Sequence, residues 1–236
     1  MDAKTIQQTL RQLADPGIAA HSQRFFKTGP GQYGEGDQFL GIRIPVLRQL
    51  IPRFAQTPLP AISETLHSPY HEERLFALLL MVAQFAKGNQ PYRTLLYHSY
   101  LKHTDCINNW DLVDCSAHQI VGAFLHDGDR TILAQLATSQ SLWERRIAII
   151  ATYHFIKQHS YSDCLTIAGL LLGDRHDLIH KAVGWMLREV GKRDWATEEL
   201  FLQHCYKDMP RTMLRYAIEK FPEQRRQEYL QGRISL

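Results

Sequence analysis

An aromatic ring and a carboxylate lie one helical turn apart in residues 108–114, which read NNWDLVD. Trp110 and Asp114 occupy positions i and i+4, and side chains at that spacing share one face of a helix. An ionised carboxylate is rarely buried without a partner. A ring face attracts positive charge through its quadrupole, and a carboxylate attracts it by Coulomb force. The pair therefore predicts a surface that binds a cation.

The elements that would position this pair are helices. Helical periodicity covers almost the whole chain, and no stretch alternates as a strand. Breaks rich in Pro, Gly or polar residues fall at residues 29–36, 58–60, 88–91, 127–129 and 173–177. Small or aliphatic residues recur in similar contexts at spacings of 36, 35, 34 and 35, at Ala77, Val113, Ala148, Ala182 and Ala217. This period predicts an all-α solenoid (superhelix) of HEAT-like repeats, a single domain over residues 1–236.

Composition excludes several classes of protein. The 236 residues are 44% hydrophobic and 22% charged, which is ordinary for a soluble globular protein. The four cysteines form no CxxC pair, so we expect neither disulfides nor structural zinc, and a reducing cytoplasm fits. The polar start lacks the pattern of a signal peptide, and the longest apolar run, residues 75–85, is too short to span a bilayer. A net charge of +3 permits a polyanionic partner without requiring one.

Basic residues gather in the last two repeats. If the second helix of each repeat lines the concave surface, residues 110–114, 146 and 181–188 converge on one groove. The cations that would make this groove basic are Lys181, Arg188, Lys192, Arg193, Arg211, Arg215, Lys220, Arg225 and Arg226. Such spacing suits a phosphate backbone. The alternative is that these are solvated helix faces neutralised by Glu189, Glu198, Glu199, Glu219 and Glu223.

Four segments in this order resemble the AlkD family of bacterial alkylpurine DNA glycosylases. They read FLGIRIP at 39–45, NNWDLVD at 108–114, LWERRIA at 142–148 and KAVGWMLRE at 181–189. The resemblance implies a solenoid of HEAT-like repeats that removes cationic alkylated purines, of the 3-methyladenine and 7-methylguanine type, from double-stranded DNA. It implies a bacterial cytoplasmic enzyme, associated with the nucleoid through its function, that needs no metal or other cofactor. We expect a monomer without membrane contact.

Residue by residue, the resemblance assigns the catalytic carboxylate to Asp114 and the two cleft tryptophans to Trp110 and Trp185. The cleft arginine falls on Arg146, with Arg145 as the alternative match. The DNA-binding residues expected on this basis are Arg145, Lys181, Arg188, Lys192, Arg193 and Arg215. The glycine-rich residues 29–36 have no counterpart in the family pattern. We interpret them as a mobile connector with Tyr33 or Lys27 near DNA.

The implied chemistry explains these residue types. A purine alkylated at N3 or N7 leaves as a neutral base, so the leaving group needs no acid, and the sugar becomes an oxocarbenium-like cation. A carboxylate at Asp114 would stabilise that cation and orient or deprotonate water. The tryptophan faces would add cation–π attraction, and the arginine would hold a phosphate. The resemblance also implies excision without base flipping. No lysine lies beside Asp114, so we expect a monofunctional enzyme.

Other interpretations remain open. Both tryptophans are candidates for core packing, and Asp111 is a better candidate for a structural role than Asp114. His176 and His180 would share a helix face and could bind a metal if the whole segment is helical, although a third ligand is missing. Cys115 or Ser116 would need a histidine partner other than the adjacent His118 to act as a nucleophile. A non-catalytic DNA-binding protein and a protein-interaction scaffold are the two alternative functions.

Overall fold

The computed structural model describes residues 1–234 and contains two compact units, Met1–Phe124 and Leu125–Leu236. Both units are built from helices, and within residues 1–234 the one pairing of extended backbone is a bridge between Gln38 and Tyr70. The prediction of an all-α fold without a sheet is confirmed. The single domain over residues 1–236 stays a prediction, and its last two residues, 235–236, lie outside the described part.

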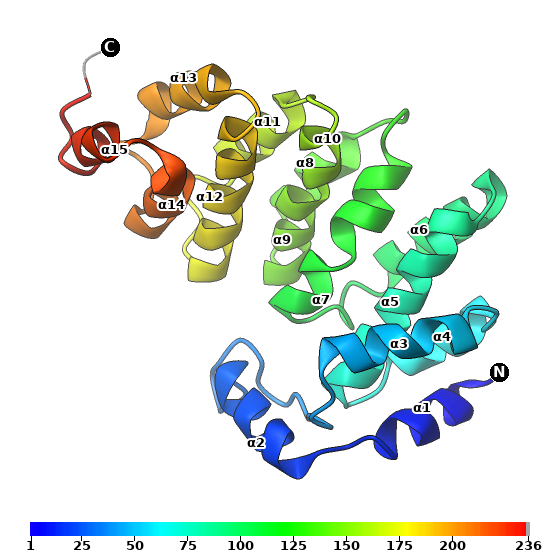
Figure 1. The fold of residues 1–236 in the computed structure, drawn as a ribbon. Helices are drawn as coiled ribbons and strands as arrows, with labels where there is room; N and C mark the ends of the chain where they lie inside the picture. Colours follow the sequence, from blue (N-terminus) through cyan, green and yellow to red (C-terminus); the bar gives the residue numbers. More distant parts are fainter. Residues whose placement is uncertain (235–236) are drawn as a thin grey trace. The chain divides into compact units, whose positions relative to one another are not determined.

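The first unit is organised around one long buried helix (Figure 1). Its helices are α1 (Ala3–Arg11), α2 (Pro16–Phe25), α3 (Ile44–Phe54), α4 (Leu59–Leu66), α5 (His71–Lys87), α6 (Gln90–Lys102), α7 (Trp110–Asp114) and the π-helical turn η1 (His118–Gly122). Helix α5 contacts α1, α3, α4, α6, α7 and η1, so its residues 75–85 form the centre of the core. The apolar run is therefore a core helix. No helix in residues 1–234 is long and apolar enough to cross a membrane.

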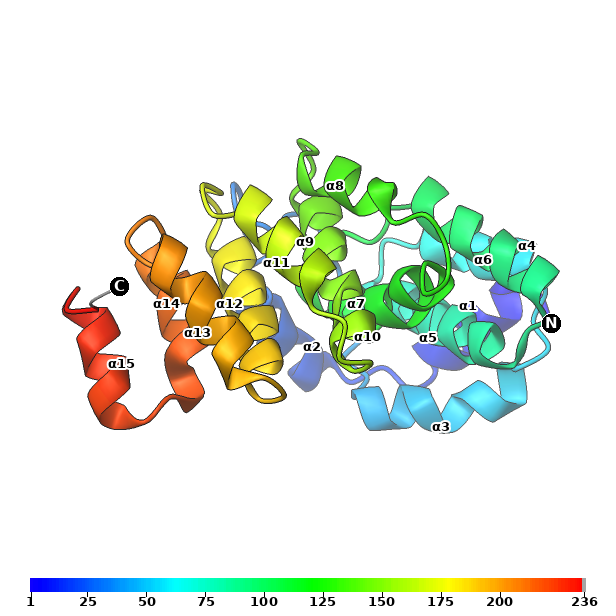
Figure 2. The same cartoon turned by 90° about the horizontal axis from the view of Figure 1, so that it is seen from above.

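The second unit stacks helices in pairs (Figure 2). Its helices are α8 (Thr131–Ala137), α9 (Leu142–Ala151), α10 (Tyr153–Ile156), α11 (Ser162–Leu170), α12 (Asp177–Gly191), α13 (Trp195–Cys205), α14 (Arg211–Ala217), η2 (Ile218–Lys220) and α15 (Glu223–Leu230). Helix α12 packs between α9 and α14. Gly184 permits the close approach of α14, because a Cβ atom there would lie 2.4 Å from the Met213 carbonyl oxygen.

The repeat inferred from the sequence corresponds to helices in the structure. Its five aligned residues lie on five different helices, α5, α7, α9, α12 and α14, and each is fully buried: Ala77, Val113, Ala148, Ala182 and Ala217. Burial of one position per repeat is what stacked helix pairs require, since each pair covers the apolar face of the next. The repeat frame is therefore confirmed as a pattern of buried helical positions.

The glycine-rich residues 29–36 form a series of turns closed by hydrogen bonds. The Gly34 amide donates to the Lys27 carbonyl at 3.2 Å, and the Gly31 amide donates to the Glu35 carboxylate at 2.9 Å. Gly34 is buried against the backbone, where a Cβ atom would lie 2.6 Å from the Phe26 carbonyl oxygen. The segment is thus folded onto the end of α2 by these contacts, and its mobility stays a prediction.

Candidate functional site

Helix α7 carries Trp110 at its first position and Asp114 at its last. Five residues are too few for a helix that is stable by itself, so tertiary contacts must hold it. The Asn109 side chain accepts a hydrogen bond from the Trp110 amide at 2.9 Å, and Leu112 and Val113 are fully buried. A π-helical turn follows within four residues, an irregularity that is frequent at functional sites. The predicted helix is present, although it is much shorter than its repeat context indicates.

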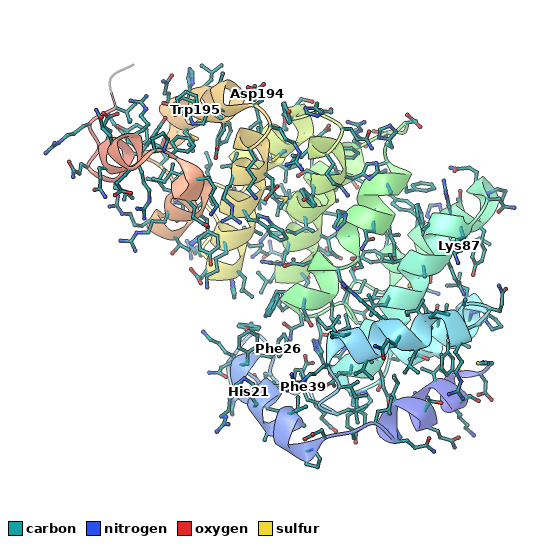
Figure 3. All side chains as sticks on the ribbon, viewed as in Figure 1. His21, Phe26, Phe39, Lys87, Asp194 and Trp195 are labelled. Carbon is teal, nitrogen blue, oxygen red and sulfur yellow. The ribbon has the colours of Figure 1, made fainter. Side chains whose placement is uncertain are left out.

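One face of Trp110 is covered by aromatic side chains from the end of α2. The Phe26 ring stacks on Trp110 with centroids 5.3 Å apart and an interplanar angle of 18°. Phe25 meets the indole edge-on at 6.0 Å and is itself 58% exposed. Phe39 stacks on the other side of the cluster, 5.1 Å from Phe26, and the two rings lie close together beside α2 (Figure 3). Trp110 is therefore half-buried and held in a fixed plane.

A network of buried charges lies at the first turn of α7. The His71 ring is placed between two carboxylates, with Nδ1 3.2 Å from Asp37 and Nε2 2.8 Å from Asp111. Asp37 also accepts from an Arg74 guanidinium nitrogen at 2.6 Å and from the Asn109 amide at 3.0 Å. All five side chains are buried. Their bonds connect α5, the 37–42 segment and α7.

Opposite charges decide the protonation of this network. Burial by itself lowers the pKa of His71, but the Asp111 and Asp37 carboxylates outweigh it and raise that pKa to about 9. Burial by itself raises the pKa of Asp37, yet hydrogen bonds from His71 and Asn109 and the charge of Arg74 bring that pKa below its ordinary value. An imidazolium between carboxylates is therefore the state at neutral pH.

The neighbours of Asp114 are not nucleophiles. Ser116 is fully buried, and its hydroxyl donates to the Leu112 carbonyl at 2.5 Å and lies 2.9 Å from the Tyr100 hydroxyl. Burial raises the pKa of the Cys115 thiol, and the Asp111 and Asp114 carboxylates raise it further. A neutral thiol is a poor nucleophile. Asp114 itself is half-buried, whereas Asp111 is engaged by His71, as its expected structural role requires.

The other predicted site residues lie in the second unit. Arg146, on α9, is 5% exposed and donates to the Leu178 carbonyl at 2.5 Å. Its neighbour Arg145 donates to the Asp174 carboxylate at 2.6 Å and to two carbonyl groups at 3.0 Å. Trp185, on α12, is half-buried, and its ring lies 6.1 Å from that of Tyr153. Arg145 and Arg146 are thus both engaged by neighbouring groups, and the choice of the cleft arginine between them stays a prediction.

Most of the cations expected to bind DNA are paired with carboxylates. Lys181 lies 2.6 Å from Asp177, Lys192 and Arg193 lie 2.6 and 3.0 Å from Glu189, and Arg188 pairs with Glu219. Arg225 and Arg226 pair with Glu199 and Glu223. Arg215 is exposed and forms no ion pair with residues 1–234. Carboxylates therefore neutralise most of these cations, but Glu189, Glu198 and Glu199 are buried and not solvated. The basic groove stays a prediction.

The first unit carries unpaired cations, of which the sequence analysis singled out one, Lys27. Arg24, Lys27, Arg43 and Arg48 are exposed and form no ion pair within the described part of the chain. Arg24 and Lys27 flank the two phenylalanines that cover Trp110. The string Arg-Phe-Phe-Lys at residues 24–27 was the available signal, since basic residues interleaved with aromatic ones are typical of nucleic-acid contacts. Lys27 alone was expected near DNA.

The histidine pair considered for a metal has other bonds. His176 precedes α12, where its Nδ1 accepts a hydrogen bond from the Leu178 amide at 3.2 Å. His180 Nε2 lies 2.6 Å from the Asp174 carbonyl oxygen. The condition that both residues lie on one helix is not met, and no group of three His, Cys, Asp or Glu side chains in residues 1–234 is arranged to hold a metal ion.

Comparisons with known proteins identify relatives of the chain. A family model described as "DNA alkylation repair enzyme" matches residues 6–221. Among solved structures, the chain is similar to one described as a predicted DNA alkylation repair enzyme from Enterococcus faecalis, with a TM-score of 0.70 and 17% sequence identity. That match covers 89% of this chain and 97% of the other, and at this identity it shows a shared fold. No curated protein matches the chain.

Proposed function

Because the chain belongs to the DNA alkylation repair enzyme family, we propose that it is a monofunctional DNA glycosylase that hydrolyses the N-glycosidic bond of cationic alkylated purines in duplex DNA. The observation that carries the proposal is helix α7, which presents Trp110 and Asp114 at its two ends, with Phe26 fixing the plane of the indole. A fixed ring and a carboxylate on one helical turn match the charge that develops on the sugar.

Asp114 has the catalytic role in this proposal. The alkylated base leaves as a neutral molecule, so the cost of the reaction lies in the positive charge at C1′. A carboxylate close to that atom stabilises the charge in the transition state and accepts a proton from the attacking water. The neutral Cys115 thiol and the buried Ser116 offer no competing nucleophile. Water is therefore the nucleophile, and the products are a free base and an abasic site.

The aromatic and basic residues bind the substrate. Phe26 covers one face of Trp110, and the exposed part of the indole is available to the deoxyribose and its developing charge. In the second unit, the half-buried ring of Trp185 is the proposed second aromatic contact. Four exposed cations of the first unit bind phosphates: Arg24, Lys27, Arg43 and Arg48. None of them forms an ion pair within residues 1–234. Contact through the sugar is consistent with excision without base flipping.

The product identifies the reaction. The purified protein would be incubated with a duplex that holds one 7-methylguanine, and the released material and the strand would be analysed by mass spectrometry. Free 7-methylguanine with an abasic site supports the glycosylase. Guanine restored in the strand would indicate direct dealkylation, a nicked strand would indicate lyase activity, and binding without product would leave a non-catalytic DNA-binding protein.

The substrate class is tested with neutral lesions. The same duplex with an uncharged damaged base, 1,N6-ethenoadenine, requires a leaving group that must be protonated. The proposal assigns no residue to protonate the leaving base, so the ethenoadenine should remain while 7-methylguanine is released. Release of both bases at similar rates would contradict the dependence on a cationic leaving group.

A further inference from the structure

We propose that His71 is a positioning residue of this site: as an imidazolium between Asp37 and Asp111 it fixes the orientation of α7, and with it Trp110 and Asp114. The inference rests on the proposed function. His71 is 2% exposed, so it has almost no surface with which to contact DNA and its action is indirect. Its experiment includes one readout that is independent of excision.

Two ionised carboxylates on one ring require its charged form. A neutral imidazole carries one N–H, and an ionised carboxylate can only accept hydrogen bonds. Both ring nitrogens face a carboxylate oxygen, Asp37 Oδ2 at 3.2 Å and Asp111 Oδ2 at 2.8 Å. The second oxygen of each carboxylate is also used, since Asp37 Oδ1 accepts from Arg74 and Asp111 Oδ1 accepts from the Leu112 amide at 3.0 Å. The ring must therefore donate from both nitrogens.

Two routes lead from this ring to the start of α7. In the first, His71 donates to Asp111, the residue that follows Trp110. In the second, Asp37 accepts from Asn109, the residue that precedes Trp110, while it also accepts from His71. Trp110 is thus bracketed by two side chains that depend on the same buried cluster. A five-residue helix has few other means of fixing its direction.

A third route runs through the aromatic rings. The His71 ring is stacked on Phe39 at 4.7 Å and lies 4.9 Å from Phe26, which in turn stacks on Trp110. A positive charge over ring faces is attracted by their quadrupoles, most strongly where water is absent. The imidazolium therefore supports the cluster that fixes the plane of Trp110, in addition to the helix that carries it.

Hydrogen bonds from the backbone hold the segment that carries Asp37 and Phe39 against α5. The Glu72 carboxylate accepts three backbone N–H groups, from Leu40, Gly41 and Ile42, at 2.8, 2.7 and 3.2 Å. The His71 amide donates to the Gln38 carbonyl at 2.8 Å. The segment that carries Asp37 and Phe39 is thereby tied to the first turn of α5. The charged groups that face the ring are Asp37 from this segment, Arg74 from α5 and Asp111 from α7.

A pair of substitutions separates the two hydrogen bonds of the ring. A glutamine amide reaches about as far as Nε2 of histidine, and an asparagine amide about as far as Nδ1. His71→Gln therefore keeps a donor for Asp111, and His71→Asn keeps one only for Asp37. Both variants lose the ring, the charge and the stacking, so they share any general loss of stability. They differ in the bond that reaches α7.

The measurement is the single-turnover rate of 7-methylguanine release with DNA affinity determined in parallel. Misplacement of a catalytic group by about 1 Å lowers a rate by about 10². We expect the rate of His71→Asn to fall by this factor relative to the wild type. The rate of His71→Gln should be about tenfold higher than that of His71→Asn, and the dissociation constant for DNA should be unchanged in both variants. Equal rates in the two variants, or a loss that follows DNA affinity, would overturn the inference.

The independent readout is the titration of the His71 ring by NMR, assigned by its absence from the spectrum of His71→Gln. The imidazolium signal should persist to a pH of about 9, well above the ordinary range of histidine. Titration near pH 6.5 would overturn the inference even if excision were never observed. A wild-type protein that keeps the imidazolium but releases no base would instead count against the proposed function alone.

Discussion

Buried charged clusters occur in both units of the molecule, and they differ in how their polar atoms are satisfied. Around His71, both ring nitrogens and all four carboxylate oxygens of Asp37 and Asp111 have hydrogen-bond partners, and Arg74 Nε is buried without one among residues 1–234. In the second unit, Glu198 Oε1 and the Tyr206 hydroxyl are buried without a partner among the described residues. The first arrangement can hold a helix in one orientation, whereas the second lowers stability.

Exposed cations show a second contrast. Those of the first unit, Arg24, Lys27, Arg43 and Arg48, are unpaired within residues 1–234, whereas five of the six residues expected to bind DNA are committed to carboxylates. A charge that already has a partner releases fewer counterions on binding DNA. We therefore expect that freedom from ion pairs, more than the number of basic residues in a segment, decides which cations contact DNA.

The largest effect on stability is expected from Asp37→Asn. This change leaves His71 and Arg74 as buried cations with one fewer carboxylate, and breaking a buried pair typically lowers the free energy of unfolding by about 3–5 kcal/mol. The matched control is Lys220→Gln, which breaks an exposed pair with Glu219 and should change it by about 0–1 kcal/mol. Urea denaturation measures both. Similar small losses in the two variants would mean that the buried charges around His71 contribute no more to stability than an exposed ion pair.

His71 and Glu198 should both make the protein less stable as the pH rises, for different reasons. The fold favours the charged form of His71 and the neutral form of Glu198. The pKa of His71 is raised to about 9, so its stabilisation is complete below about pH 6.5 and is lost as the pH rises through 9. Burial, and then the charge of Glu199, raise the pKa of Glu198 to about 9. Its carboxyl group is therefore kept neutral in the fold, and this lowers stability increasingly from about pH 4.5 upward.

Glu198→Gln should accordingly stabilise the protein at pH 8, by on the order of 1–3 kcal/mol, and leave it unchanged near pH 4.5. His71→Gln should destabilise it at pH 6 and have less effect above pH 9. Thermal or urea unfolding across this range tests both variants. A Glu198→Gln variant less stable than the wild type at pH 8 would show that this carboxyl group is satisfied after all.

Trp110→Ala and Trp185→Ala compare the two tryptophans. Each should raise the barrier for base release by about 0.5–2 kcal/mol, the scale of a cation–π contact. Trp110→Ala should also lower the melting temperature more, because it removes a ring stacked on Phe26, whereas Trp185 meets Tyr153 at a tilt of 43°. Single-turnover rates and calorimetry give the two quantities. A greater loss of stability in Trp185→Ala would contradict this order.

The smallest effect is expected for a single exposed cation. Arg215→Ala should weaken DNA binding and reduce the slope of log K against log salt by about 1. Arg225→Ala is the control, because Arg225 pairs with Glu199 and Glu228 and should leave the slope unchanged. Fluorescence anisotropy at several salt concentrations measures the slope. An equal change in both variants would mean that ion pairing does not decide which cations meet phosphate.

Local patterns in the sequence were enough to predict the fold class and the positions of Trp110 and Asp114 on one helix. The apolar period located the helices and the five buried repeat positions, since stacking demands one buried residue per repeat. The spacing of Trp110 and Asp114 placed both on α7, because positions i and i+4 depend only on helix geometry. The candidate pair and the fold class are therefore consequences of local periodicity.

The side chains that hold α7 and Trp110 in place could not be predicted from local patterns. Asp37, His71 and Asp111 are separated by 34 and 40 residues, and no local spacing joins them. The same is true of Phe26, which meets Trp110 only after folding, and of the pairs Arg145–Asp174 and Arg188–Glu219. Tertiary contacts between distant charges decide which cations stay free. A count of lysine and arginine does not show which of these cations form ion pairs.

Asp114→Asn tests the central claim most directly, because the change keeps the size and shape of the side chain and removes its charge. The matched control is Asp127→Asn, at a side chain that is 93% exposed. Single-turnover release of 7-methylguanine should fall by at least about 10² in Asp114→Asn, the scale for loss of one preorganised electrostatic group, and stay at the wild-type rate in Asp127→Asn. DNA affinity should be unchanged or slightly higher in the Asp114 variant, because a carboxylate near phosphates is repulsive until the sugar cation forms. Release at the wild-type rate by Asp114→Asn would contradict the account.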